Sequence, residues 1–155
     1  MGLFSLFSKG AGRYLSEKDN ERIVAAVRQA EQRTSGEIRV FFESRCRYVH
    51  AVDRAAEIFF GLNMNQTVLR NGVLVYVAFR DHQFAIFADE GIYKEMGAEY
   101  WNLEAKKMLS AFSKENHADG IISVINDIGE ALHTHFPYDS HIDKNELPDD
   151  IVFGK

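Results

Sequence analysis

The chain has 155 residues, of which 46% are hydrophobic and 26% charged, the composition of an ordinary folded domain. Its formal net charge of -5 argues against a nucleic-acid surface, because phosphate binding needs a basic stripe that this sequence lacks. Its single cysteine, Cys46, excludes an intramolecular disulfide, and no run approaches the roughly 20 apolar residues that span a bilayer. We therefore expect one cytoplasmic domain without a transmembrane segment.

Two helices and a strand are predicted in the first part of the chain. Ser16 can cap a helix over residues 17 to 33, in which apolar residues recur at helical spacing. The segment Glu37–Glu43 alternates as a strand does, with Ile38, Val40 and Phe42 on one face. A second helix is predicted over residues 50 to 62, with its apolar positions at Val52, Ala55, Ala56 and Phe59.

The middle of the chain reads as a hairpin followed by helices. Asn71-Gly72 opens an apolar strand, a short polar turn follows, and a second strand leads through Asp89-Glu90-Gly91 into a helix. Two long helices then carry apolar residues from Trp101 to Phe112 and from Ile121 to Leu132. The domain is expected to cover residues 14 to 137, and residues 138 to 155 an acidic, irregular tail.

This order of elements predicts a three-layer α-β-α sandwich with a small mixed sheet. The first two strands are joined through a helix, which makes them parallel, whereas the third follows a short turn and is antiparallel. The end of the third strand then lies at the same edge of the sheet as the beginnings of the first two. This chain direction should gather five polar residues at one edge: Glu37, Arg70, Asn71, Asp89 and Glu90.

Several segments resemble the TPM domain family, also called TPM phosphatases, from about Ser16 to the C-terminus. They include Ser35-Gly-Glu-Ile-Arg, Asn71-Gly-Val-Leu-Val-Tyr-Val, Phe84-Ala-Ile-Phe-Ala-Asp-Glu-Gly-Ile and Asp143-Lys-Asn-Glu-Leu-Pro-Asp-Asp. The chain is most similar to the short, soluble bacterial members. The resemblance implies a helix–sheet–helix sandwich, binding of a divalent cation such as calcium and, from some plant members, acid phosphatase activity. It places the family's Asp-x-Gly on Asp89-Glu90-Gly91.

A divalent-cation site is the leading functional prediction. Asp89 and Glu90 are hard oxygen donors of the kind that Ca²⁺ prefers, and Glu37 and the side-chain carbonyl of Asn71 are the other candidate ligands. The ion would be Ca²⁺, with Mg²⁺ as the alternative, and its role structural or partner-docking. A second interpretation of Asp89 stays open, namely that it caps the following helix.

Two other functions remain open. One is a metal-dependent acid phosphatase on small phosphomonoesters, in which a metal-held water attacks phosphorus near Arg70. The sequence identifies no catalytic residue for it, because Val52 stands where a cysteine phosphatase built on Cys46 needs its arginine. The other is a protein interaction module that uses the apolar N-terminus and the acidic tail.

Overall fold

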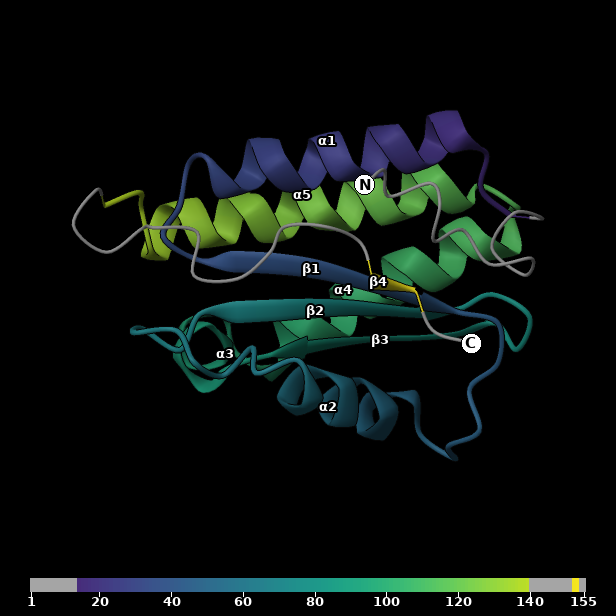
Figure 1. The fold of residues 1–155 in the computed structure, drawn as a ribbon, viewed down its shortest axis with the longest axis horizontal. Coiled ribbons are helices and arrows are strands. Elements are labelled where there is room, and N and C mark those ends of the chain that lie inside the picture. Colours follow the sequence, from purple (N-terminus) through teal and green to yellow (C-terminus); the bar gives the residue numbers. More distant parts are fainter. Residues whose placement is uncertain (1–13, 140–151, 154–155) are drawn as a thin grey trace.

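The structure is a computed structural model that describes residues 14–139 and 152–153 (Figure 1). Its elements follow the order α1 (Glu17–Glu31), β1 (Glu37–Glu43), α2 (Ala51–Gly61), β2 (Gly72–Ala78), β3 (Gln83–Ala88), α3 (Glu90–Met96), α4 (Ala98–Ser113), α5 (His117–His135) and β4 (Val152–Phe153). The described strands form one mixed sheet in the order β3-β2-β1-β4. The predicted α/β fold is confirmed.

The register of the sheet determines which residues share an end. β1 and β2 are parallel, with Glu37 opposite Gly72, and β2 and β3 are antiparallel, with Val73 opposite Ala88. The row that begins at Glu37 therefore runs through Gly72 to the residue after Ala88, which is Asp89. We call this the Asp89 end of the sheet, and the opposite end, where β1 finishes, the Glu43 end.

Helices cover both faces of the sheet, as the predicted sandwich requires. Ile38, Val40 and Phe42 of β1 belong to the larger core, which includes buried residues of α1, α4 and α5. Figure 1 shows α1 alongside α5, and α2 on the far side of the sheet from them. The smaller core joins Phe41 and Tyr76 to α2. Alternation along β1 thus separates two apolar faces, and all seven of its residues are buried.

Two helical features differ from the sequence prediction. Val52 was expected on the apolar face of its helix, but it is 48% exposed; α2 buries Ala55 and Phe59 as predicted, together with Ala51 and Ile58. The helix after Asp89 is also separate from the long one that follows. Gly97 divides α3 from α4 with a φ of 81°, in the left-handed region that a residue without Cβ adopts readily.

The tail is not irregular throughout. Val152 and Phe153 form β4, which pairs in parallel with Phe41 and Phe42 of β1. Residues 1–13, 140–151 and 154–155 lie outside the described residues, and so do the expectations for the apolar N-terminus and most of the acidic tail. Within the described residues, no helix combines the length and the apolar character needed to cross a membrane.

Candidate functional site

The Asp89 end brings the five predicted polar residues onto one edge of the sheet. The backbone N–H of Asp89 donates to the Gly72 carbonyl at 2.9 Å, and that of Glu37 donates to the Asn71 carbonyl at 3.3 Å. Neighbouring strands are about 4.8 Å apart, so Glu37 and Asp89 lie roughly 10 Å from one another across β2. The common edge follows from the chain direction alone.

Asp89 is buried, with 3% of its surface exposed, and its carboxylate is fully engaged. Nε and Nη2 of Arg70 donate to its two oxygens, each at 2.8 Å. The backbone N–H of Glu90 also donates to Oδ1 at 2.8 Å, so Asp89 is the N-cap of α3. The capping interpretation is therefore correct, and the same carboxylate accepts a bidentate arginine.

Arg70 joins both acidic residues of the motif. Its Nη1 donates to Glu90 Oε1 at 3.2 Å, and the Glu90 side chain is 64% exposed. The hydrogen bonds from its guanidinium to Asp89 raise the pKa of Arg70. Two carboxylates thus converge on one monovalent cation, which leaves an uncompensated negative charge at this position.

The space around Gly91 explains why the Asp89-Glu90-Gly91 motif ends in glycine. Its N–H donates to the Arg70 carbonyl at 2.9 Å, so the loop before β2 lies directly against the start of α3. A Cβ at this position would come within 2.2 Å of the Leu69 carbonyl oxygen and 2.6 Å of that of Arg70. Only glycine permits this approach, and it holds Arg70, whose φ is 53°, beside Asp89.

Asn71 is held by two residues that sequence reasoning missed. Its backbone N–H donates to Thr67 Oγ1 at 3.2 Å, and its Nδ2 donates to Ser35 Oγ at 3.3 Å. Its Oδ1 is buried without a hydrogen-bond partner. A buried amide oxygen without a donor costs roughly 1–3 kcal/mol, so this oxygen is available to a ligand. No spacing rule connects Ser35 or Thr67 with Asn71, because the contacts depend on tertiary structure.

The predicted ligands do not form a preassembled cage. Glu37 is 3% exposed, and by strand alternation it lies on the same face as Phe41, toward α2. The Asn71 amide is instead turned toward Ser35. Across residues 14–139, no three acidic, histidine or cysteine side chains are grouped closely enough to hold a metal ion. Metal binding by Asp89, Glu90, Glu37 and Asn71 stays a prediction.

Comparison with known proteins identifies the family. The TPM domain matches over residues 11–131 of this chain. The chain belongs to the TPM domain family. This TPM domain is similar to the NMR structure of the BA42 protein from the psychrophilic bacterium Bizionia argentinensis, with a TM-score of 0.81 and 37% sequence identity. That match covers 91% of this chain and 96% of the other. Among curated proteins, nothing matches.

Proposed function

We propose that this TPM domain binds a divalent cation, Ca²⁺ or Mg²⁺, at the Asp89 end, in exchange for the Arg70 guanidinium. The observation that carries the proposal is the convergence of Asp89 and Glu90 on that guanidinium, at 2.8 Å and 3.2 Å. Two carboxylates carry twice the charge that one arginine neutralises, whereas a divalent ion would neutralise both. Hard oxygen donors are the ligands that these ions prefer.

The surroundings supply what an exchange requires. The Arg70 side chain is 37% exposed, so it can turn into water when an ion replaces it. The unpartnered Oδ1 of Asn71 is a further oxygen at this end, and buried Glu37 is the remaining candidate ligand. Displacing an arginine opposes binding, so we expect a weak site, with a Kd on the order of 10⁻⁴–10⁻³ M.

The role proposed for the ion is to clamp α3 to the loop before β2. That loop already touches α3 through Gly91 and the Arg70 carbonyl. An ion held by Asp89 and Glu90 would strengthen the junction and present a positive charge to an anionic partner. We place this function in the bacterial cytoplasm, as expected from the sequence, which cell fractionation tests.

The test is a calcium titration of the wild type and three variants, in which calorimetry measures affinity and the melting temperature measures stability. The wild type should gain thermal stability with Ca²⁺, since any ligand that prefers the folded state stabilises it. Arg70→Gln should bind about tenfold more tightly, because it removes the competing cation. Glu90→Gln should bind more weakly with little change in stability, because this side chain is 64% exposed.

The matched control is Arg33→Gln, which removes an exposed arginine that pairs with Glu130. Its calcium affinity should equal that of the wild type. If Ca²⁺ leaves the melting temperature of the wild type unchanged, or if Arg70→Gln binds no more tightly than Arg33→Gln, the exchange proposal is wrong.

The phosphatase alternative rests on the family resemblance. It predicts turnover of an aryl phosphate that requires Ca²⁺ or Mg²⁺ and is lost in Asp89→Asn. Turnover that survives this substitution would place the activity elsewhere. The interaction-module alternative concerns residues outside those described, and deletion of residues 1 to 12 tests it through loss of a binding partner with calcium affinity retained.

A further inference from the structure

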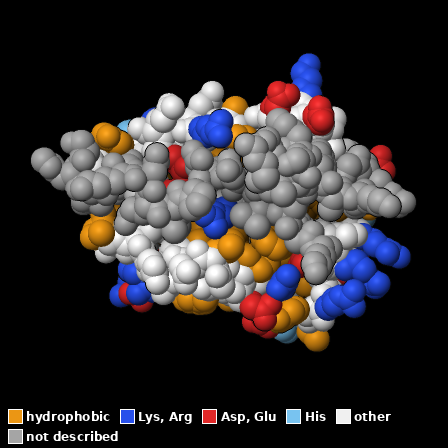
Figure 2. All heavy atoms as spheres, viewed as in Figure 1, with side chains coloured by type: hydrophobic (Ala, Val, Ile, Leu, Met, Phe, Trp, Pro, Cys, Tyr) orange, Lys and Arg blue, Asp and Glu red, His pale blue; other side chains and the backbone are white. Residues whose placement is uncertain are grey.

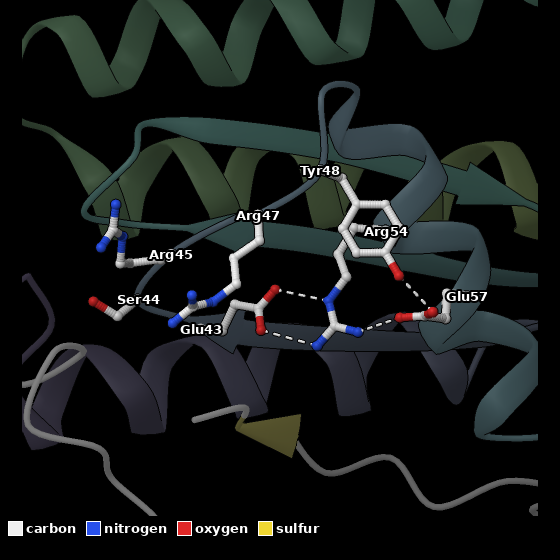
Figure 3. Close-up of a pocket in the computed structure, with 7 residues that line it drawn as sticks. All are labelled: Glu43, Ser44, Arg45, Arg47, Tyr48, Arg54 and Glu57. Carbon is white, nitrogen blue, oxygen red and sulfur yellow. Dashed lines mark hydrogen bonds and ion pairs between the residues drawn. The ribbon is translucent and has the colours of Figure 1, made fainter.

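A second cluster of charged side chains lies at the Glu43 end of the sheet, opposite the proposed cation site. It lines an open pocket of about 640 Å³ between the end of β1 and the start of α2 (Figure 3). Pockets of this size hold small organic molecules. Its lining residues are Glu43, Ser44, Arg45, Arg47, Tyr48, Arg54 and Glu57.

One side of the pocket is a completed ion-pair network. Arg54 donates to the two oxygens of Glu43 at 2.9 Å and 3.0 Å, and to Glu57 at 2.5 Å. The Tyr48 hydroxyl donates to the other oxygen of Glu57, and buried Tyr76 donates to Glu43. These contacts raise the pKa of Arg54, with the Glu43 hydrogen bonds as the main cause. Every carboxylate oxygen of this network accepts a hydrogen bond, although two carboxylates on one guanidinium leave one negative charge, as they do at the Asp89 end.

The other side carries arginines that the network does not use. Within the described residues, Arg47 makes no hydrogen bond or ion pair, whereas Arg45 forms an ion pair with Asp81 at 3.8 Å. Figure 3 shows both side chains on the side of Glu43 away from Tyr48 and Glu57. Figure 2 shows basic side chains gathered over the β1–α2 loop. On this side of the pocket, the guanidinium of Arg47 is therefore a donor without an acceptor in the part of the chain that the structure describes.

The backbone of the segment that carries these arginines is fixed by hydrogen bonds. The Arg80 N–H donates to the Ser44 carbonyl at 2.8 Å, and the Cys46 N–H donates to Asp81 Oδ2 at 2.9 Å. Cys46 is buried, so the residues before and after it extend outward from an anchored backbone. Anchoring reduces the entropy that a ligand must overcome in ordering the site.

The charge of the lining selects the class of ligand. Glu43 and Glu57 share Arg54, and Arg45 pairs with Asp81, so the positive charge left without a partner among the described residues is that of Arg47, which matches a monoanion. A carboxylate carries that charge, and its two oxygens fit one guanidinium in a bidentate pair, whereas a phosphate monoester carries about twice the charge. The Tyr48 ring, 39% exposed, offers an apolar surface for the rest of the molecule. We propose that this pocket binds a small aromatic carboxylate, held by Arg47 with Tyr48 against its ring.

Benzoate is the probe, and backbone amide chemical shifts are the measurement. Titration should shift the amides of residues 44 to 48 and leave those of residues 67 to 71 in place. Arg47→Gln should weaken binding by about tenfold, the effect of losing one charge-assisted pair. Arg47→Lys keeps the charge but loses the bidentate geometry of the guanidinium, so its affinity for benzoate should lie between those of Arg47→Gln and the wild type. Arg33→Gln, which alters an exposed arginine outside the pocket, should bind as the wild type does.

Two further ligands test which chemical class of ligand the pocket binds. Benzamide has the same ring without the charge, and phenyl phosphate has the ring with more charge. The proposal requires benzoate to bind more tightly than both. It is wrong if benzamide binds equally well, if phenyl phosphate binds more tightly, or if Arg47→Gln has no effect. Because Arg47 has no partner in the described chain, its variants should melt as the wild type does, so a lost interaction would not reflect misfolding.

Discussion

The two ends of the sheet use the same ion pair in different surroundings. At the Asp89 end Arg70 grips a carboxylate through two bonds of 2.8 Å, and at the Glu43 end Arg54 does so at 2.9 Å and 3.0 Å. Both carboxylates are buried. Each arginine also meets a second acid, Glu90 at one end and Glu57 at the other, but two further arginines line the Glu43 end.

The difference shows that a bidentate pair does not by itself define a site. The charge that remains unpaired around the ion pair determines which ligand each end favours. At the Asp89 end the excess is negative, and it favours a cation. At the Glu43 end Glu57 is likewise a second acid on Arg54, but Arg47 adds a positive charge that has no partner in the described chain, and this charge favours an anion.

The largest expected effect is a disruption of the Asp89 end alone. Gly91→Ala would place a Cβ 2.2 Å from the backbone oxygen of Leu69, which cannot move without displacing the loop. We expect a loss of more than about 3 kcal/mol in the free energy of unfolding, measured by urea denaturation. Gly61→Ala is the control, because a Cβ there meets nothing within 4 Å and should be neutral or slightly stabilising. Equal effects of the two substitutions would contradict the packing described for α3.

Substitution of the two arginines should have smaller effects on stability, and the two effects should differ. Arg54→Gln leaves buried Glu43 without its cation and should lower the free energy of unfolding by about 2 to 3 kcal/mol. Arg70→Gln should cost about 1 kcal/mol, because Arg70 is more exposed and Asp89 keeps its bond from Glu90. Added Ca²⁺ should restore the stability of Arg70→Gln and not that of Arg54→Gln. Restoration of both, or of neither, in thermal denaturation would remove the distinction between the ends.

A third buried carboxylate sharpens the comparison, since it lacks an arginine. Glu104 is 3% exposed, with Lys107 at 3.2 Å as its cation and its Oε1 unpartnered. Burial, together with a hydrogen bond to Asp127, raises the pKa of Glu104 to about 7. The folded state therefore holds this proton more tightly than the unfolded state, whose pKa is near 4.5. Its contribution is most favourable below pH 4.5 and is lost as the pH rises to 7.

Glu104→Gln tests this direction of the pH dependence of stability. Relative to wild type, the variant should gain about 2 kcal/mol in the free energy of unfolding between pH 4.5 and pH 7, because it has no proton to lose. The exposed Glu130→Gln should show no such relative gain, its carboxylate being 61% exposed. Denaturation curves at several pH values measure both. A difference between wild type and Glu104→Gln that does not change with pH would show that Glu104 titrates normally.

The sequence predicts the position of the Asp89 end but not its contacts. Alternation predicts β1 with its observed bounds, Glu37–Glu43, and chain direction then places Asp89 in the same row as Glu37. The pairing of Arg70 with Asp89 could not be predicted, because it depends on the left-handed backbone of Arg70 and on the close approach at Gly91. Local patterns describe periodicity, and they contain no information on such tertiary approaches.

The Glu43 end was missed for a related reason. Glu43 and Arg54 are 11 positions apart, one on a strand and one on a helix. Their contact depends on how α2 is rotated over the sheet, which apolar spacing determines only loosely. The same rotation exposes Val52, which the spacing assigned to the core, and buries Ile58. A helix with small and branched residues on adjacent faces can satisfy the helical period in more than one orientation.

The parallel crossover between β1 and β2 has a consequence for the order of folding. Arg70 and Asp89 are 19 positions apart and flank the β2–β3 hairpin, whereas Asn71 and Ser35 are 36 positions apart and meet only when β1 has docked. Short loops close sooner than long ones, so the hairpin should form its ion pair first. An intermediate with β1 undocked would already hold the arginine on its carboxylate while the Asn71 amide still faced water.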